Sequence, residues 1–137
     1  MIMKSLTLEA KPENIEAVTQ FIDGELEALD CNMKAQMQID VAIDELFSNI
    51  AYYAYAPGTG QATVTFDFDE SSRTVSIAFI DAGVPFDPLQ KNDPDLTAPA
   101  EERAIGGLGI FMVKKTMDAM RYVRQDNRNI LTIQKRI

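Results

Sequence analysis

Apolar and polar residues follow two different periods along this chain of 137 residues. Strict alternation predicts strands, and apolar residues spaced three and four apart predict amphipathic helices. Alternating segments cover residues 4–9, 62–69, 73–81, 121–125 and 129–137. Segments with helical spacing cover residues 12–30, 33–55 and 107–120. The polar residues 70–72 and 126–128 fall between neighbouring strands, so we expect each to close a hairpin.

The segment from residue 84 to residue 105 breaks this regularity. It shows no sustained period and holds four of the six prolines, Pro85, Pro88, Pro94 and Pro99. Connections longer than about 12–15 residues are uncommon in compact domains and are usually functional covers or disordered. The sequence therefore predicts either a lid over a ligand at 84–105 or a surface loop without a role.

Length and charge narrow the class of protein. With 137 residues and 46% apolar residues, one domain over 1–137 is expected. The formal net charge of -8 and the lack of a basic run interleaved with aromatic residues argue against a nucleic-acid partner. No run reaches the roughly 20 apolar residues that span a bilayer, and Cys31 is the single cysteine. We therefore expect a cytoplasmic protein with no membrane partner.

The chain contains no histidine. This excludes Ser-His-Asp and Cys-His catalytic arrangements, zinc sites with histidine ligands and a self-contained phosphohistidine relay. Any catalysis by these residues must use carboxylates, amides or a metal ion.

Glu45 and Asn49 lie four residues apart on the second predicted helix, so both side chains project from one face. Their neighbours are strongly apolar, which favours partial burial. A carboxylate here can accept a proton from a hydroxyl, and an amide oxygen suits Mg²⁺. The alternative is a solvated helix face stabilised by a side-chain pair.

Asp81 and Gly83 stand where the third predicted strand ends and the long loop begins. A carboxylate in that place can accept a hydrogen bond from an exocyclic amine such as that of adenine. Glycine leaves the backbone free to lie against a flat ring. Ordinary turn chemistry is the other interpretation of these two residues.

A glycine run stands where the loop gives way to the third predicted helix. It consists of Gly106, Gly107, Leu108, Gly109 and Ile110. Backbone amides at glycines can approach a ligand closely, and the first turn of a helix offers unpaired N–H groups to phosphate. A tight turn or a close packing contact is the alternative. The next lysine is too distant for a Walker A motif, and Met112 replaces the third glycine of a dinucleotide fingerprint.

The order of these motifs resembles that of the GHKL ATPase/kinase superfamily. Three boxes carry the resemblance: Glu45-x-x-x-Asn49, Asp81-x-Gly83 and the glycine run after a proline-rich loop. The resemblance spans nearly the whole chain. It implies an α+β fold of the Bergerat type, a two-layer sandwich with a mixed, mostly antiparallel sheet, three helices on one face and an ATP lid.

Within that superfamily the chain is similar to the small bacterial anti-sigma regulatory factors with serine protein kinase activity, the RsbW/SpoIIAB type. The likeness lies in its size, in the sequence Pro85-Phe86-Asp87-Pro88 and in the stretch Phe111-Met112-Val113-Lys114-Lys115-Thr116-Met117-Asp118 of the third predicted helix. In many relatives a second glycine stands where this chain has Pro85. That substitution stiffens the base of the lid.

The resemblance implies a role for each matching residue. Glu45 would be the general base, Asn49 the Mg²⁺ ligand, Asp81 the acceptor for the adenine amine and Gly83 the backbone beside the ring. The glycine run, Gly106 to Ile110 with Leu108 inside it, would hold the phosphates of ATP through main-chain amides. Arg103 would either reach the γ-phosphate or remain solvated.

The resemblance also implies a function, the transfer of the ATP γ-phosphate to a serine or threonine of a STAS-domain anti-sigma-factor antagonist. A sigma factor and a second copy of the chain, forming a homodimer, are further candidate partners. Two alternatives stay open: an ATP-dependent binding module that transfers nothing, and a detached catalytic domain of a histidine kinase. A retained Glu45 favours chemistry over binding alone.

Overall fold

The computed structural model of the protein describes residues 3–90 and 107–137, and the predicted strands and helices lie within them. The elements follow in the order β1 (Lys4–Glu9), α1 (Ile15–Ala28), α2 (Met33–Asn49), β2 (Gln61–Asp69), β3 (Thr74–Asp81), α3 (Gly107–Thr116), β4 (Ala119–Gln125) and β5 (Arg128–Arg136). Single turns of 3-10 helix precede α1 at Pro12–Asn14 and follow β3 at Pro88–Gln90.

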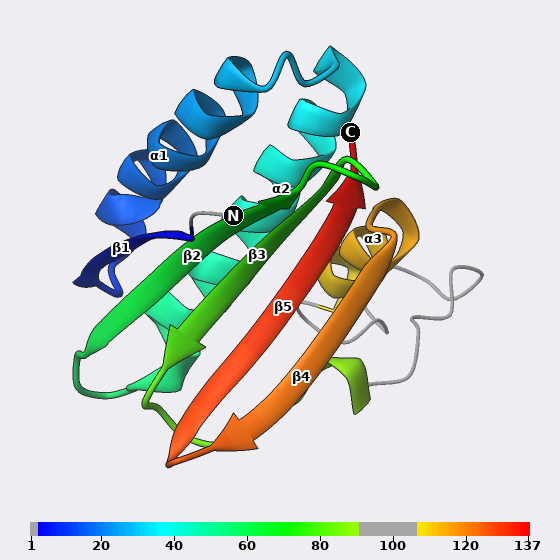
Figure 1. Cartoon of the computed structure of the whole chain (residues 1–137). Helices are drawn as coiled ribbons and strands as arrows, with labels where there is room; N and C mark the ends of the chain where they lie inside the picture. The colour runs from blue at the N-terminus through cyan, green and yellow to red at the C-terminus, as the bar shows by residue number, and fades with distance from the viewer. Residues whose placement is uncertain (1–2, 91–106) are drawn as a thin grey trace.

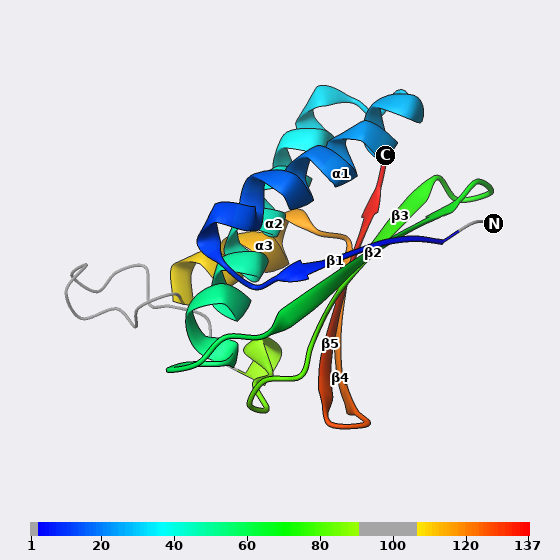
Figure 2. The same cartoon turned by 90° about the vertical axis from the view of Figure 1, so that its left-hand side faces the viewer.

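The five strands form one sheet in the order β1-β2-β3-β5-β4. Figure 1 shows the sheet in front of the helices, and Figure 2 shows α1, α2 and α3 on one of its faces. The α+β sandwich expected from the resemblance is therefore confirmed. All four pairings among the described strands are antiparallel, so the sheet is not mixed there.

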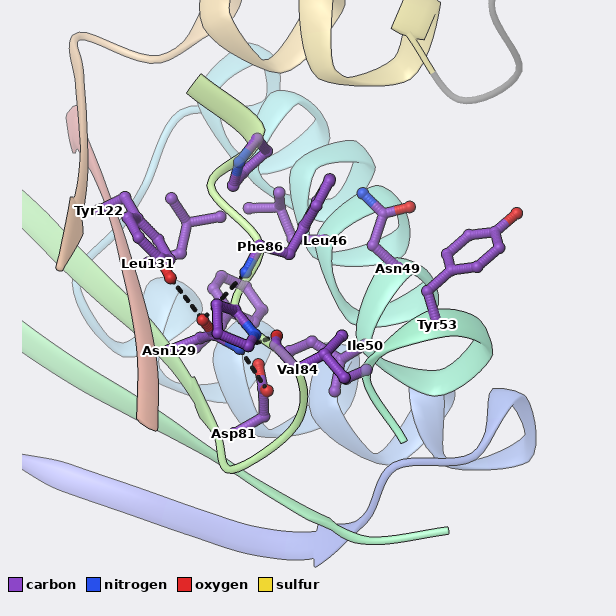
Figure 3. Close-up of a pocket in the computed structure, with 14 residues that line it drawn as sticks. Leu46, Asn49, Ile50, Tyr53, Asp81, Val84, Phe86, Tyr122, Asn129 and Leu131 are labelled. Carbon is purple, nitrogen blue, oxygen red and sulfur yellow. Dashed lines mark hydrogen bonds between the residues drawn. The ribbon is translucent and has the colours of Figure 1, made fainter. Parts of the chain in front are cut away.

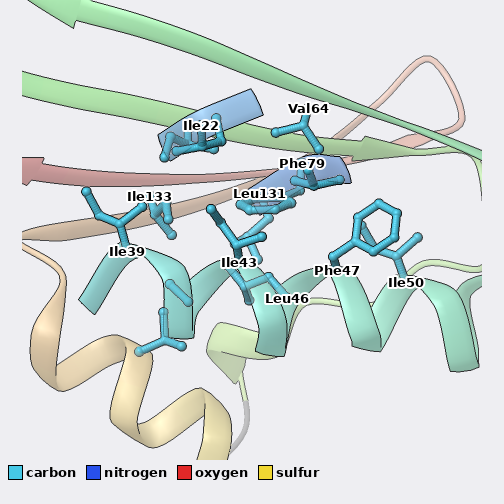
Figure 4. Packing of buried hydrophobic residues seen from close by; sticks show 14 of the residues in the cluster. Ile22, Ile39, Ile43, Leu46, Phe47, Ile50, Val64, Phe79, Leu131 and Ile133 are labelled. Carbon is cyan, nitrogen blue, oxygen red and sulfur yellow. The ribbon is translucent and has the colours of Figure 1, made fainter. Parts of the chain in front are cut away.

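The hydrophobic core lies between the sheet and α2, the central helix of the layer. Figure 4 shows Ile39, Ile43 and Phe47 of α2 between the helix and the strands. They meet inward residues at every second position of the strands, such as Val64 and Phe79. The apolar face of α2 thus packs on the apolar face of the sheet, as the helical and the alternating spacing of the sequence predicted.

Two element ends differ from the sequence expectation. The second helix does run to Ala54, but its last turn, Ile50–Ala54, is a π-helix. The third helix ends at Thr116 instead of Met120, and β4 begins at Ala119. Met117 and Met120 gave that segment a helical spacing, yet both pack against the core from beyond the helix. Apolar spacing cannot separate the end of a buried helix from the start of a strand.

The turn between β4 and β5 has two residues, one fewer than the polar segment 126–128 predicted, because Arg128 already belongs to β5. Asp126 and Asn127 have φ values of 52° and 61°. Positive φ at both central residues matches the twist of a two-residue hairpin, and Asp and Asn tolerate that region better than other non-glycine residues. This hairpin fixes the register of β5 beside β4.

Two carboxyl groups face each other where α1 packs on α2. The Oδ1 atoms of Asp23 and Asp40 are both buried, and no described group donates a hydrogen bond to either. Burial is the main cause that raises the pKa of Asp40 to about 7, and a hydrogen bond with Asp23 and the charges of Asp23 and Glu27 add to it. Asp40 therefore keeps its proton up to about neutral pH.

We expect Asp40→Asn to stabilise the fold above pH 7. The folded pKa of about 7 exceeds the ordinary 3.8, so the contribution of protonated Asp40 to stability is complete below about pH 4 and is lost as the pH rises to about 7. At pH 8 the substitution should raise the free energy of unfolding by on the order of 1 kcal/mol, because solvent screens part of the effect. The measurement is urea unfolding from pH 4.5 to pH 8.5.

The control is Asp44→Asn, which changes an exposed carboxylate on the same helix. Its stability difference from the unsubstituted protein should stay nearly constant over this pH range. A difference for Asp40→Asn that does not grow with pH would contradict the raised pKa of Asp40.

Candidate functional site

A cavity of about 140 Å³ opens between the end of α2 and the ends of β3 and β5. A single water needs roughly 10–15 Å³, so this cavity holds more than isolated waters. In Figure 3, Asn49 and Tyr53 stand on one side of the cavity, with Tyr122 and Asn129 on the other. The lining consists of Leu46, Asn49, Ile50, Tyr53, Ala54, Phe79, Asp81, Val84, Pro85, Phe86, Pro88, Tyr122, Asn129 and Leu131.

Asp81 is the one carboxylate among these lining residues and is only 6% exposed. The inward positions of β3 are otherwise apolar, Val75, Ile77 and Phe79. The Oδ1 atom of Asp81 accepts hydrogen bonds from the backbone N–H of Gly83 at 2.9 Å and from Nδ2 of Asn129 at 2.9 Å. No described residue donates to Oδ2, which leaves this oxygen to accept a bond from a ligand.

Asn129 is a residue of this site that the sequence analysis missed. It lies directly opposite Asp81 in the pairing of β3 with β5 and is 5% exposed. Its Nδ2 also donates to the carbonyl oxygen of Val84 at 2.8 Å. Its Oδ1 accepts bonds from the hydroxyl of Tyr122 and from the N–H of Phe86. One polar residue on an otherwise apolar inward face was the signal that could have found it.

Gly83 lies too close to α2 for any other residue. A Cβ at this position would stand 2.2 Å from the carbonyl oxygen of Ala54. The next residue, Val84, donates its N–H to that same oxygen at 3.0 Å, and Arg124 donates to the carbonyl of Gly83 at 2.8 Å. The glycine thus lets the base of the predicted lid pack directly on the π-helical turn.

Tyr55 joins the strands that border this turn. Its hydroxyl donates to the carbonyl of Gln61 at 2.6 Å and accepts from the N–H of Ala82 at 2.7 Å. A Cβ on Gly60 would stand 2.3 Å from its ring, so Gly60 makes room for it. The sequence analysis did not identify Tyr55, because tyrosine near a helix end carries no distinctive pattern.

Asn49 lies at the rim of the cavity and no described residue hydrogen-bonds to its side chain. Mg²⁺ usually keeps several waters and takes only one or two protein ligands beside substrate phosphates. A single amide oxygen is therefore compatible with a magnesium ion bound largely by phosphate. Among the described residues no group of three or more carboxylate or thiol side chains could hold a metal ion by itself.

Glu45 lies outside the cavity, against the first turn of α3. A Cβ on Gly109 would stand 2.1 Å from Cδ of Glu45, so a larger residue there would require this flexible carboxylate to move. Burial raises the pKa of Glu45, and the charge of Asp44 adds to the effect. No described residue donates a hydrogen bond to the carboxylate, which leaves it able to accept a proton.

The remaining predicted residues are placed only in part. Arg103 and Gly106 lie outside the described residues, as does most of the predicted lid. Gly107 and Leu108 open α3, as the sequence predicted. Ile110 is 4% exposed and packs in the core, so only its main chain is available to a ligand.

Residues 8–135 match the family described as the histidine kinase-like ATPase domain. The match covers nearly the whole chain. It includes Asp81 and Asn49 at the cavity, and it includes Glu45 and Gly109 at the start of α3. The chain belongs to this family. The GHKL resemblance inferred from the three boxes is therefore confirmed.

Relatives of this ATPase domain are named as protein kinases. The chain is 29% identical over 100 residues to the serine/threonine-protein kinase BtrW of Bordetella bronchiseptica. The aligned region covers 73% of this chain and 70% of BtrW. It is 30% identical over 95 residues to the serine-protein kinase RsbW of Bacillus cereus, covering 66% of this chain. The match spans 58% of that RsbW, less than two thirds of its length.

A solved structure supports the fold of this ATPase domain. The crystal structure of the RsbU and RsbW domains of Rv1364c from Mycobacterium tuberculosis matches with a TM-score of 0.70 and 17% identity. The match covers 99% of this chain and 32% of that one. Among the described residues of this ATPase domain, no helix has both the length and the apolar content that a membrane span needs.

The two close glycine contacts of this ATPase domain predict losses of different size on substitution by alanine. Gly83→Ala should lower the free energy of unfolding by about 1–3 kcal/mol, because its Cβ would meet the backbone of Ala54, which cannot move aside. Gly109→Ala should change stability by less than about 1 kcal/mol, since Glu45 can swing away and alanine is the better helix former. Urea unfolding measures both.

Gly24→Ala is the matched control, because a Cβ at this exposed α1 position would meet nothing within 4 Å. It should stabilise the fold by roughly 0.5–1 kcal/mol. Equal losses for Gly83→Ala and Gly109→Ala would show that the contact with Ala54 has no special cost.

Proposed function

We propose that this chain binds Mg-ATP and transfers its γ-phosphoryl group to a serine or threonine hydroxyl of a partner protein. One observation carries the proposal: a buried carboxylate, Asp81, keeps an oxygen free in an apolar cavity beside α2. Small-molecule sites combine apolar walls with a few placed polar groups of this kind. The kinase names of the relatives agree with this chemistry.

The cavity suits the adenine of ATP. Leu46, Ile50 and Leu131 offer apolar walls to a flat ring, and Oδ2 of Asp81 accepts the hydrogen of an exocyclic amine. Guanine carries an oxygen in place of that amine, and a carboxylate repels it. The site therefore favours adenine over guanine.

The first turn of α3 suits the phosphates. Unpaired N–H groups and the positive end of the helix dipole favour anions there. Gly107 and Gly109 lie in that turn, and the carboxylate of Glu45 lies beside Gly109. Gly106 and Arg103, outside the described residues, would extend this phosphate site.

Asn49 stands between the two ends, at the rim of the cavity and one turn along α2 from Glu45. Its amide oxygen would hold Mg²⁺, together with phosphate oxygens and water. A bound magnesium ion would offset the negative charge of the phosphates, which an acidic protein with a net charge of -8 otherwise repels.

Glu45 would act as the general base of the transfer. The partner's hydroxyl oxygen forms a bond to the γ-phosphorus while the bond from that phosphorus to the β–γ bridging oxygen breaks. The hydroxyl proton passes to Glu45, and ADP leaves. The raised pKa of Glu45, caused mainly by burial, makes this carboxylate a better proton acceptor.

The partner we propose is a STAS-type anti-sigma-factor antagonist, with a sigma factor as the regulated output. Incubation with γ-labelled ATP, Mg²⁺ and a STAS protein encoded near this chain, followed by phosphosite mapping, tests it. One phosphoserine or phosphothreonine on the STAS protein is expected. Nucleotide binding without label on any partner would favour a binding module, and labelled histidine would favour the histidine kinase alternative.

Asp81→Asn should weaken ATP binding by about 10- to 150-fold, the loss expected for one charge-assisted hydrogen bond. The substituted amide can keep its oxygen toward Gly83 and Asn129, so both internal bonds survive. Only the group that faces the ligand changes, from an acceptor to a donor. Calorimetric titration with ATP and GTP measures it, and unchanged ATP affinity would exclude Asp81 from adenine binding.

Glu45→Gln should keep nucleotide affinity but slow phosphoryl transfer by roughly 10²–10⁴-fold, as expected when a general base is lost. The unsubstituted protein should also lose transfer rate as the pH falls through the raised pKa of Glu45. Single-turnover transfer to the STAS protein from pH 5 to pH 8 measures both effects.

Asp44→Asn is the control for this experiment, because it changes the exposed neighbouring carboxylate. It should leave the transfer rate at pH 8 unchanged. Normal transfer by Glu45→Gln would make Glu45 a structural residue.

A further inference from the structure

We propose that Asn129 is the positioning residue that makes the cavity selective for adenine, by holding Asp81 with one oxygen turned inward and the other left for the ligand. This inference rests on the adenine site proposed above and assigns the origin of its selectivity to a residue of β5. Asn129 needs no contact with the nucleotide for this role.

The hydrogen bonds of Asn129 give it four partners from three parts of the chain. Its Nδ2 donates to Oδ1 of Asp81 at 2.9 Å and to the carbonyl of Val84 at 2.8 Å. Its Oδ1 accepts from the N–H of Phe86 at 3.3 Å and from the hydroxyl of Tyr122. Both amide hydrogens and both lone-pair directions are therefore engaged.

This arrangement fixes the rotation of the Asp81 carboxylate. Two donors, the N–H of Gly83 and the amide of Asn129, both bind Oδ1. If the carboxylate rotated, both bonds would have to be broken or remade on the other oxygen. Because Asp81 and Asn129 face each other across paired strands, the sheet itself sets the distance between them.

The same amide group also fixes the wall of the cavity. Val84 and Phe86 line the cavity on the segment that follows β3, and Asn129 bonds the backbone of both. Pro85, between them, has no N–H to offer. Asn129 thus sets the position of the recognising carboxylate and of the adjacent wall together.

Loss of Asn129 should remove selectivity more than affinity. In Asn129→Ala, Asp81 keeps only the Gly83 donor, so its carboxylate can rotate and solvate in several ways. The benefit that adenine gains from its amine then falls. Apolar contacts and phosphate binding do not depend on that amine.

The test compares ADP with purine riboside diphosphate, which lacks the exocyclic amine, by calorimetric titration. The unsubstituted protein should bind ADP about 10- to 150-fold more tightly than the amine-free nucleotide. In Asn129→Ala this preference should fall by at least about fivefold, the equivalent of one net hydrogen bond. Asn129→Ser, which keeps one donor, should recover part of the preference.

Three outcomes decide whether Asn129 positions Asp81 for adenine selectivity. If Asn129→Ala weakens both nucleotides by the same factor and keeps the preference, Asn129 is only structural and the inference is wrong. If the unsubstituted protein binds both nucleotides equally, the adenine assignment fails, and the inference fails with it. A preference that falls in Asn129→Ala and partly returns in Asn129→Ser supports the inference.

Thr132→Ala is the matched control, because Thr132 lies on the same strand but its position points to the open face of the sheet. It should keep the full preference for ADP. Circular dichroism and the thermal midpoint show that each variant is folded, and Asn129→Leu, of nearly the same size, replaces Asn129→Ala if that variant does not fold. Its side chain cannot donate to Asp81, so the preference should also fall.

Discussion

The site of this ATPase domain depends on one cross-strand pair, Asp81 and Asn129. A buried carboxylate costs free energy unless donors surround it, and here β5 and the turn after β3 supply two. The pair lies inside an antiparallel sheet, so its geometry is as rigid as the ladder that carries it. The turn at Gly83 and the cavity wall at Phe86 are both hydrogen-bonded to this pair.

The two ends of the site are built differently. The proposed adenine end is formed by strands and is held by buried hydrogen bonds. The proposed phosphate end is formed by the first turn of α3, where Gly109 lies close to Glu45 and no described residue donates a hydrogen bond to the carboxylate. α2 joins them, because Glu45 faces α3 while Asn49, one turn later, faces the cavity. A single helix thus sets the distance between the proposed adenine site and the proposed site of phosphoryl transfer.

Much of this could be predicted from the sequence, because hydrophobic periods report burial directly. The strands at Lys4–Glu9 and Thr74–Asp81, and the start of α3 at Gly107, were predicted to within a residue. Asp81 and Glu45 were identified from motif order. Asn129 was missed, since its importance comes from a partner 48 residues away, and only the sheet register brings them together. The end of α3 was misplaced because Met117 and Met120 stay apolar after the helix stops.

A crystal structure of the protein with bound Mg-ADP tests the central claim most directly. The amine nitrogen of adenine should lie about 2.7–3.2 Å from Oδ2 of Asp81. Oδ1 should keep its bonds to Gly83 and Asn129, as in the protein alone. Adenine bound outside the cavity, or a carboxylate of Asp81 turned away from Asn129, would contradict the account.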